Sequence, residues 1–578
     1  MSLIRSYIKL TRKVSWADIL ILISISAVLY GVIHFGENFK AEFKPLTEID
    51  LSPLALPEYS FFSLVRGFAA YAISLLFTLV YGYIAAYNRR AEKIMVPFLD
   101  ILQSIPVLGF LPGLVIALIA VFPHSNIGLE LAAILMIFTG QVWNMTFSFY
   151  RSLQSIPNEL REAAKVYRLN WWRRFTKLEL PYSTMGLVWN SMMSMAGGWF
   201  FLTISEAFII GDKDFRLPGI GSYMSAAIHD GNVPAMIYAV IAMSLMIITV
   251  DQLLWKPLVM WAQKFKFEET EAAIVPKSKV LDILRSSHII LFVREKIIIP
   301  VINFLKPLAT YTKNKIDNSE KRVAVFQKIF KSVVGWMFKL IFLSAALYGS
   351  YKLLGLLISV NIDEWKTIGV DLFLTFLRVC AAVVIGSLWT IPAGVAIGMN
   401  PRLSKIFQPV IQVVASFPAP MLFPIVLLIL MKLGGSIEYG SILLMMLGTQ
   451  WYILFNVIAG AMAIPSDLRE AASINRLSKF MKWKRLILPG IFPSLVTGWV
   501  TATGGAWNAS IVAEYVHFGN DVLAATGLGA KITLATDVAN FGVLAASVIA
   551  MSTTVVLINR FFWKKLYVLA EEKYSLTK

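Results

Sequence analysis

Long apolar segments alternate with short polar segments along nearly the whole chain of 578 residues. A helix that crosses a bilayer needs about 20 consecutive, mostly apolar residues. Segments of that length lie near residues 16–35, 60–86, 100–122, 128–150, 185–211 and 235–261 in the first half, and near 333–359, 367–397, 408–431, 438–460, 492–512 and 540–562 in the second. The pattern therefore predicts an all-α polytopic membrane protein with about 12 transmembrane helices, six in each half.

The composition supports a protein that resides in a lipid bilayer. Hydrophobic residues make up 57% of the chain and charged residues only 15%, a balance that soluble globular proteins of this length do not show. The net charge of +18 could indicate nucleic-acid binding, but the Lys and Arg residues lie between apolar segments instead of forming one patch. With Cys380 as the only cysteine and five scattered histidines, we expect no disulfide and no metal site.

The charges of the loops predict the orientation, because Lys and Arg are retained on the cytoplasmic side of a membrane. Basic residues are concentrated in alternate loops, at 88–90, 151–177, 264–331, 401–405 and 479–485, whereas the loops at 37–50, 124–126, 361–364 and 434–438 carry few. We therefore expect both termini in the cytoplasm. An even number of spans per half makes the two halves parallel repeats, related by a pseudo-twofold axis along the membrane normal.

One polar segment occurs twice. SIPNELREAAKVYRLNWWRRFTKLELP begins at Ser155 and AIPSDLREAASINRLSKFMKWKRLILP begins at Ala463, far more widely spaced than the units of a repeat array. This indicates duplication of a whole domain, with a first repeat at 1–262 and a second at 333–578. The charged region 263–332 between them is expected to be a cytoplasmic linker, in which 289–305 forms an interfacial or packed helix or else enters the membrane.

Each copy of the duplicated segment, at 155–181 and 463–489, is predicted to form two short helices. Pro157 and Pro465 should stop the preceding helix, and Asn158 and Ser466 should cap the next one. The corresponding features of the second short helix are caps at Asn170 and Ser478 and ends at Pro181 and Pro489. The small pairs Ala163–Ala164 and Ala471–Ala472 leave a helix face that another protein can approach. An ordinary basic loop explains the charges but not this recurrence in register, so the pattern favours a docking element.

The duplicated segment resembles the cytoplasmic signature of the membrane subunit of type I ABC importers, which is Glu-Ala-Ala, three residues, Gly, nine residues, an aliphatic residue, any residue, and Leu-Pro. The matching residues are Glu162, Ala163, Ala164 and Pro181 in the first copy, and Glu470, Ala471, Ala472 and Pro489 in the second. The glycine position differs, because Arg168 and Arg476 occupy it. Glycine permits a left-handed turn, which arginine adopts only at a cost of about 1 kcal/mol, so the departure allows a differently shaped turn.

This resemblance implies a division of labour between proteins. The first short helix would insert into a cleft of a separate ATPase subunit, with Glu162 and Glu470 orienting it, and two such subunits would bind ATP and Mg²⁺. The sequence contains no Gly-x4-Gly-Lys-Ser/Thr loop to hold a nucleotide, so we expect no enzymatic activity and no cofactor on this chain. The resemblance also implies a soluble extracytoplasmic binding protein and a place in the bacterial inner membrane.

Further motifs resemble the nitrate, sulfonate, taurine and bicarbonate branch of this class, in which fused double permeases look like those assigned to anion transport. They are Ser104-Ile105-Pro106, repeated as Ser416-Phe417-Pro418, and Gly219-Ile220-Gly221, repeated as Gly527-Leu528-Gly529. The resemblance implies a small oxyanion or an organic anion as the substrate.

Two arginines lie just inside the extracellular ends of predicted spans, where an ionised side chain usually faces a pathway or a partner. Arg66 lies at a similar depth to Glu206, and Arg378 at a similar depth to Glu514. The four residues are candidates for two structural ion pairs or for direct contact with a passing anion, and snorkelling of the arginines is a third interpretation. In the fourth helices, Trp143, Asn144, Gln450 and Trp451 either line a central path or serve packing.

Two other functional classes need consideration. A secondary transporter with two parallel repeats would be driven by an ion gradient and would place ionisable residues near the midplane. That class leaves the duplicated segment without a role. A membrane enzyme or scaffold would need clustered nucleophiles, acids or ligands, which the sequence pattern does not offer.

Overall fold

The computed structural model describes residues 16–40, 47–210, 213–265, 347–518 and 521–574, together with a few isolated positions between 266 and 346. The chain divides into two compact units, one formed by 1–33 with 272–359 and the other by 34–271 with 360–578. The second unit contains both copies of the duplicated segment. Nearly all of the predicted linker 263–332, including the segment 289–305, lies outside the described residues.

In the first half of the chain the elements are α2 (Trp16–Lys40), η1 (Pro53–Ala55), α3 (Leu56–Tyr87), α4 (Arg89–Ser104), η2 (Val107–Phe110), α5 (Leu111–Val121), α6 (Ile127–Gln154), α7 (Asn158–Val166), α8 (Trp171–Arg174), η3 (Phe175–Glu179), α9 (Leu180–Ser205), β1 (Ala207–Ile210), β2 (Lys213–Arg216), α10 (Ile220–His229), α11 (Val233–Val250), η4 (Asp251–Trp255), α12 (Lys256–Ala262) and η5 (Gln263–Phe265).

In the second half they are α17 (Ile362–Met399), α18 (Pro401–Ser416), η7 (Ala419–Leu422), α19 (Phe423–Lys432), α20 (Ile437–Met462), α21 (Ser466–Ile474), α22 (Lys479–Lys482), η8 (Trp483–Ile487), α23 (Leu488–Ala513), β3 (Tyr515–Phe518), β4 (Asp521–Ala524), α24 (Leu528–Asp537), α25 (Phe541–Ile558), η9 (Asn559–Trp563) and α26 (Lys564–Tyr574). The order from α3 to α12 recurs, element by element, from α17 to α26. The two repeats, predicted from the duplicated segment, therefore include every described element from α3 to α12 and from α17 to α26.

The number of spans is smaller than the predicted 12 among the described residues. Seven helices are long and apolar enough to cross a membrane, or up to nine if each of two bent helix pairs counts as one span. At the predicted spans 16–35 and 333–359, the described residues contain only shorter apolar helices, Leu22–Glu37 and Leu347–Ile358. Helix α9 is long enough but is not among the seven, because its serines, its glycines and Asn190 dilute its apolar residues.

The predicted single spans at 100–122 and 408–431 are both broken helices. The chain bends by 87° between α4 and the η2–α5 segment, and by 80° between α18 and the η7–α19 segment. Proline causes both breaks, because it disfavours helical geometry at the residue before it. That residue is extended in each case, with ψ 130° at Ile105 before Pro106 and ψ 131° at Phe417 before Pro418.

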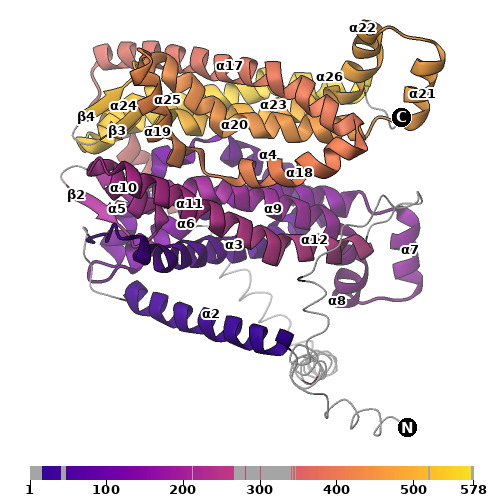
Figure 1. Ribbon diagram of the computed structural model, residues 1–578, viewed down its shortest axis with the longest axis horizontal. Coiled ribbons are helices and arrows are strands. Elements are labelled where there is room, and N and C mark those ends of the chain that lie inside the picture. The colour runs from indigo at the N-terminus through magenta and orange to yellow at the C-terminus, as the bar shows by residue number, and fades with distance from the viewer. Residues whose placement is uncertain are drawn as a thin grey trace. The chain divides into compact units, whose positions relative to one another are not determined.

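The described fold is helical, as the sequence predicts, and each repeat adds one short β-hairpin that the sequence did not predict. The predicted helix at 185–211 ends at Ser205, and β1 then pairs antiparallel with β2, Ala207 opposite Arg216. In the second repeat β3 pairs with β4, Tyr515 opposite Ala524. Phe208 stacks on Phe215 across the first hairpin, with ring centroids 5.4 Å apart. Both hairpins lie at the left-hand end of the molecule in Figure 1.

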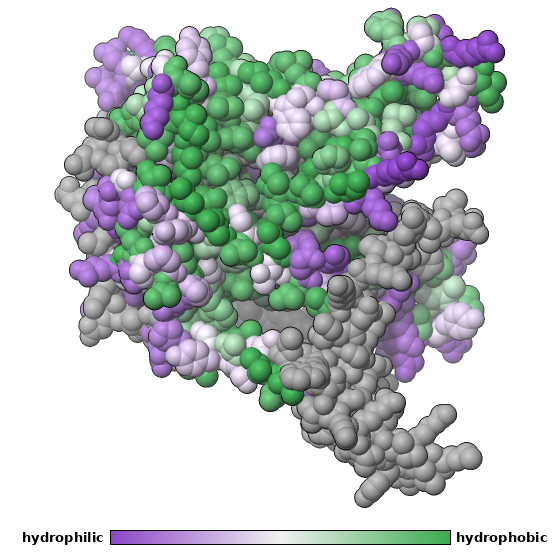
Figure 2. Space-filling view, viewed as in Figure 1, coloured by the Kyte–Doolittle hydropathy of each residue, from purple (hydrophilic) through white to green (hydrophobic). Residues whose placement is uncertain are grey.

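Within each repeat the central helix packs between two others: α6 between α3 and α9, and α20 between α17 and α23. Small residues allow the close approach. A Cβ atom added at Gly82 would lie 2.8 Å from Phe149, and one added at Gly394 would lie 2.7 Å from Val457. Figure 2 shows hydrophobic residues over the middle of the helices and hydrophilic residues towards the ends that carry the hairpins and α21–α22, as a membrane-spanning bundle requires.

The repeats contact each other through their broken helices. Helix α9 of the first repeat packs against α18 and η7 of the second, and α23 of the second packs against η2 of the first. The backbone N–H of Val107, in the break of the first repeat, donates a hydrogen bond of 2.8 Å to Oδ1 of Asn508 on α23. A Cβ atom on Gly109 would lie 2.7 Å from Val548, so the backbone of η2 lies directly against α25.

Candidate functional site

The duplicated segments form two helical protrusions, α7–α8 and α21–α22, which both lie at the right-hand end in Figure 1. Helix α7 starts at Asn158 and α21 starts at Ser466. The predicted capping by these two side chains is wrong, because neither makes a cap hydrogen bond. Instead Pro157 and Pro465 occupy the N-cap positions, where an extended ψ of 143° suits the fixed φ of proline.

The turn after each short helix is left-handed. Arg168 and Arg476 both have φ 48°, at the position where the family signature has glycine. Each turn closes with the two hydrogen bonds of a Schellman motif, including Leu169 N–H to the Ala164 carbonyl at 3.0 Å and Leu477 N–H to the Ala472 carbonyl at 3.1 Å. The turn therefore keeps the left-handed shape that glycine would favour, and the arginine adopts this conformation in spite of its steric cost.

The second short helix continues into the spanning helix. Its predicted caps are confirmed, because Asn170 accepts a hydrogen bond of 2.8 Å from the Arg173 N–H and Ser478 accepts one of 3.3 Å from the Met481 N–H. Its predicted ends at Pro181 and Pro489 are wrong. The π-helical segments η3 and η8 join α8 to α9 and α22 to α23. The wider π-helical turn lets the helix continue past Pro181 and Pro489, which have no backbone N–H to donate.

Each short helix buries one alanine of its pair, whereas the other, Ala163 or Ala471, stays at least partly exposed. Ala164 and Ala472 are buried within the chain itself. The exposed apolar side chains are Val166 and Tyr167, 78% and 79% exposed, and Ile474, 80% exposed. Glu162 and Glu470 are also exposed. The guanidinium of Arg161 donates 2.7 Å to the Leu153 carbonyl, which fixes α7 to the end of α6.

At the end that carries the hairpins, a buried arginine joins three helices of the first repeat. Arg66 on α3 is fully buried, and it donates to Glu130 on α6 through Nε at 2.6 Å and to Glu206 after α9 at 2.9 Å. It also donates 2.7 Å to the Pro218 carbonyl. Glu206 accepts further hydrogen bonds from Ser63 at 2.7 Å and from the Gly221 N–H at 2.7 Å. Every charge in this cluster therefore has a partner.

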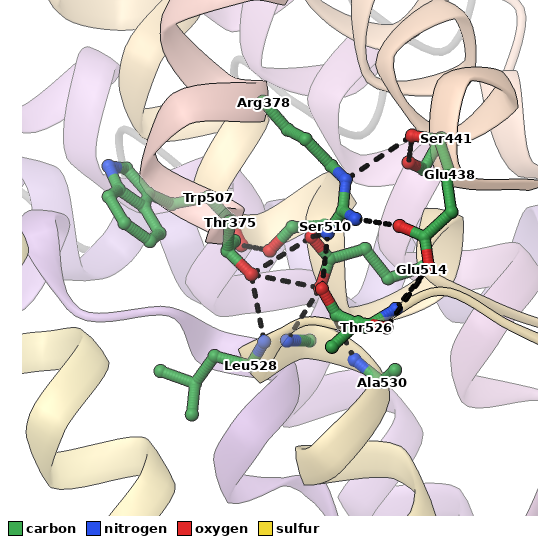
Figure 3. A network of polar contacts seen from close by, with 11 residues as sticks. Thr375, Arg378, Glu438, Ser441, Trp507, Ser510, Glu514, Thr526, Leu528 and Ala530 are labelled. Carbon is green, nitrogen blue, oxygen red and sulfur yellow. Dashed lines mark hydrogen bonds and ion pairs between the residues drawn. The ribbon is translucent and has the colours of Figure 1, made fainter. Parts of the chain in front are cut away.

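The second repeat contains the same cluster, shown in Figure 3. Arg378 donates to Glu514 at 3.0 Å, to the Thr526 carbonyl at 2.9 Å and to Glu438. Glu514 also accepts hydrogen bonds from Thr375 at 2.9 Å and from the Gly529 N–H at 2.8 Å. We call these clusters the outer clamps: Arg66, Glu130 and Glu206 in the first repeat, and Arg378, Glu438 and Glu514 in the second.

The structure brings together both residue pairs singled out in the sequence, Arg66 with Glu206 and Arg378 with Glu514. The third member of each clamp was missed. Glu130 and Glu438 stand in the first turn of α6 and α20 and look like ordinary loop-end carboxylates in the sequence. Their identical place in the two repeats was the signal that could have revealed them. The clamps differ in exposure, because Glu130 is 1% exposed and Glu438 42%.

A cavity of about 170 Å³ lies between the two repeats; we call it the inner cavity. Three of the four fourth-helix candidates line it, namely Trp143, Asn144 and Trp451. Gln450 is not among its lining residues; it is buried and accepts a hydrogen bond of 2.9 Å from Trp389. Among the described residues that line this cavity there is no Asp, Glu, Lys, Arg or His.

A second cavity, of about 320 Å³, lies between the hairpins; we call it the outer cavity. Its charged lining residues include Arg216, bound to Asp214 at 2.6 Å, and Asp537, which lies 3.4 Å from His517. Asp537 also accepts a hydrogen bond of 2.7 Å from the Tyr515 hydroxyl. Burial and this carboxylate raise the pKa of Tyr515, so the phenol remains a donor. The part of the chain that the structure describes holds no cluster of side chains suited to a metal ion.

Comparison with known proteins places this geometry in a family. Residues 78–254 and 386–562 each match the binding-protein-dependent transport system inner membrane component. Relatives include the nitrate import permease protein NrtB of Synechocystis sp., 26% identical over 36% of this chain and 73% of the relative, and the bicarbonate transport system permease protein CmpB of Synechococcus elongatus, 28% identical over 27% and 52%. The taurine transport system permease protein TauC of Escherichia coli is 28% identical over 32% of this chain and 64% of the relative.

The two family matches cover more than half of the chain and correspond to the two structural repeats. The match spans only part of each curated relative, about half in the case of the bicarbonate permease protein. A permease component carries solute and catalyses no reaction itself, in line with the sequence prediction. The chain therefore belongs to the family of binding-protein-dependent transport system inner membrane components of ABC importers and contains that permease domain twice.

Proposed function

We propose that this single chain forms the translocation pathway of an ABC importer and couples it to two separate ATPase subunits, which bind ATP and Mg²⁺. The solute is a small oxyanion or organic anion, sulfonates included, of the kind named for the nitrate, bicarbonate and taurine permeases. A soluble binding protein delivers it on the extracytoplasmic side. The permease repeats are 1–262 and 333–578, joined by a cytoplasmic linker at 263–332, with both termini in the cytoplasm.

The observation that carries this proposal is the pair of matching protrusions. Both have the same left-handed turn at Arg168 or Arg476, and both lie at the same end of the second unit. Each protrusion runs without interruption into a long helix that reaches the opposite end, through η3 into α9 and through η8 into α23. A displacement imposed on α7 or α21 by a closing ATPase dimer would therefore be transmitted to the hairpin end as a rigid-body movement.

The structure supports distinct roles for the candidate residues. Glu162 and Glu470 are exposed beside the apolar tips Val166 and Ile474, so they are available to orient each helix in an ATPase cleft. The outer clamps differ from these exposed glutamates. Arg66 and Arg378 already have carboxylate partners within the chain, which favours a structural role over contact with a passing anion. Trp143, Asn144 and Trp451 line the path between the repeats.

A secondary transporter is the second candidate, and the observations favour it less. Coupling to an ion gradient needs a titratable or ion-binding group on the pathway. The described lining of the inner cavity contains no carboxylate, and the matching protrusions would have no partner.

The test is recovery of the ATPase with the tagged chain after a change to the exposed tips. In the double variant Val166→Asp and Ile474→Asp, a charge replaces an apolar side chain that is about 80% exposed, so the fold should survive while docking fails. We expect at least a tenfold loss of copurified ATPase. Leu433→Asp is the matched control, because Leu433 is 81% exposed but follows α19 outside the protrusions. Unchanged ATPase recovery with the double variant would contradict the proposal.

A further inference from the structure

The two protrusions are attached to their repeats in different ways. We infer that α7–α8 is held rigidly by polar contacts with α3 and α6, that α21–α22 can move relative to α17, and that Glu179 is the positioning residue of the rigid attachment. The two docked ATPase subunits therefore act unequally on the membrane helices. This inference rests on the proposed function and specifies how each docking site is coupled to its repeat.

A buried carboxylate joins the first protrusion to the C-terminal end of α3. Glu179, in η3, is 1% exposed, and its Oε1 atom accepts hydrogen bonds of 2.6 Å from the Tyr87 hydroxyl and 2.7 Å from Nε of Arg174. Arg174 also donates 3.1 Å to the Tyr83 hydroxyl, and its guanidinium lies 5.2 Å from the centroid of the Tyr87 ring. Both tyrosines belong to α3, so directional, charge-assisted contacts tie the base of the protrusion to that helix.

Further hydrogen bonds tie the same region to α6. The Tyr182 hydroxyl, at the start of α9, donates 3.0 Å to the carbonyl of Ser155, directly after α6. The side-chain amide of Gln154, the last residue of α6, donates 3.1 Å to the Ala86 carbonyl on α3. The first protrusion therefore rests on helix ends that are also hydrogen-bonded to each other.

The second repeat lacks the side chains that make these contacts. The positions that correspond to Tyr83, Tyr87, Gln154, Glu179 and Tyr182 are occupied by Val395, Met399, Met462, Ile487 and Gly490. Ile487 is buried in an apolar cluster that includes Val395 and Met399. The polar attachment of the first protrusion is thus replaced by apolar packing in the second.

The two attachments resist displacement differently. A hydrogen bond holds its donor and acceptor within a narrow range of distance and angle, and a buried carboxylate cannot exchange its partners for water. Apolar contact is non-directional, so Ile487 can slide against Met399 at little cost. Farther along the second repeat, Trp499 on α23 donates 2.9 Å to Ser387 on α17, so this freedom is confined to the end that carries the protrusion. A displacement of α7 therefore moves the ends of α3 and α9 together, whereas a displacement of α21 moves the end of α23 relative to α17.

Distances between spin labels test the inference in lipid nanodiscs that contain this chain with its copurified ATPase. In a Cys380→Ser background, one label pair is placed by Ile84→Cys and Glu159→Cys and the corresponding pair by Ala396→Cys and Asp467→Cys; all four positions are exposed. Each pair joins the end of α3 or α17 to the start of α7 or α21. On binding of a non-hydrolysable ATP analogue, we expect the first distance to change by less than about 2 Å and the second by at least twice as much.

Variants of the first attachment assign the rigidity to Glu179. Glu179→Gln should at least double the change in the first distance. Tyr87→Phe removes one hydroxyl but keeps the ring, so it should act in the same direction and replaces Glu179→Gln if that variant does not assemble. Tyr81→Phe is the matched control on α3, because the Tyr81 hydroxyl donates 2.8 Å to the Met95 carbonyl on α4 and not to the protrusion. It should leave the first distance unchanged.

The outcomes separate this inference from the proposed function. Equal changes in the two distances of the parent chain, including no change in either, would overturn the inference, as would a first distance that neither attachment variant alters. If the ATPase copurifies with the labelled chain in those cases, only the inference fails. If no ATPase copurifies with the unlabelled parent chain, the proposed function fails.

Discussion

The two outer clamps show how burial determines what a charged side chain does. Arg66 is fully buried and meets two carboxylates, so one carboxylate remains in excess of the arginine, and Glu206 accepts further hydrogen bonds from Ser63 and from the Gly221 N–H. Removing the charge of one carboxylate leaves Arg66 paired with the other, but it breaks charge-assisted hydrogen bonds that water cannot replace at a buried site.

The difference in exposure between the clamps predicts unequal effects of the same substitution. Glu130→Gln, at a side chain that is 1% exposed, weakens the charge-assisted hydrogen bonds to Arg66 and should lower the free energy of unfolding by about 2–3 kcal/mol. Glu438→Gln, at one that is 42% exposed, should cost about 1 kcal/mol because water screens the pair. Thermal unfolding of the detergent-purified chain, monitored by size-exclusion chromatography, measures both. Equal losses, or a larger loss for Glu438→Gln, would show that burial does not govern the clamps.

At this scale the sequence singled out the arginines and glutamates that the structure brings together, because an ionised side chain inside a span has few ways to be satisfied. Glu130 and Glu438 were missed as the third partners, since a carboxylate in the first turn of a helix is ordinary and only its recurrence in both repeats sets it apart. The sequence also does not show which alanine of each signature pair is covered. Ala164 and Ala472 pack inside the protrusion, whereas Ala163 and Ala471 remain at least partly exposed.

Among the elements, the protrusions α7–α8 and α21–α22 depend on a turn that most residues avoid. A left-handed conformation costs an L-amino acid about 1–2 kcal/mol, and both copies carry an arginine there. The Schellman hydrogen bonds of Leu169 and Leu477 persist in spite of this cost. The cap residues Asn170 and Ser478 follow each turn directly and start the next helix.

This strain predicts a stabilising substitution. Arg168→Gly should relieve about 1 kcal/mol in the turn and slow hydrogen exchange of the Leu169 amide about threefold to fivefold. Tyr167→Gly is the control one residue earlier, where φ is −73° and glycine only adds freedom to the unfolded chain, so exchange there should become faster. Hydrogen–deuterium exchange of the segment 164–170 reads out both. Faster exchange in Arg168→Gly would mean that the arginine side chain, not the backbone, holds the turn.

The sequence did not predict the two helix breaks and the two hairpins, because the hydropathy of a long segment does not show the local features that cause them. Pro106 and Pro418 break apolar segments that are long enough to span a bilayer. Hydropathy shows the length of such a segment but not the bend within it. Strand β1 of the hairpin at 207–216 is apolar and was taken for the end of the span predicted at 185–211, whereas the hairpin at 515–524 lies beyond the span predicted at 492–512. The long helices α6 and α20 were correctly predicted, because a long, mostly apolar segment strongly favours a spanning helix over any other structure.

As a whole, the described chain consists of two matching repeats that contact each other through their broken helices and hairpins and surround two cavities. Duplication and fusion have two consequences. The turn of the duplicated segment is the same in both copies, down to the φ angle of one arginine. The lining of the outer cavity has diverged, as at Arg216 and Asp537, because a single chain can keep different residues in its two repeats.

The central claim is that one chain presents two ATPase docking sites, and the mass of the intact complex tests it most directly. Native mass spectrometry of the transporter, purified through a tag on this chain, should give one copy of the chain with two copies of the ATPase. A complex of two chains with two ATPase subunits would mean that each chain offers one working site. Recovery of the chain with no ATPase would contradict the account.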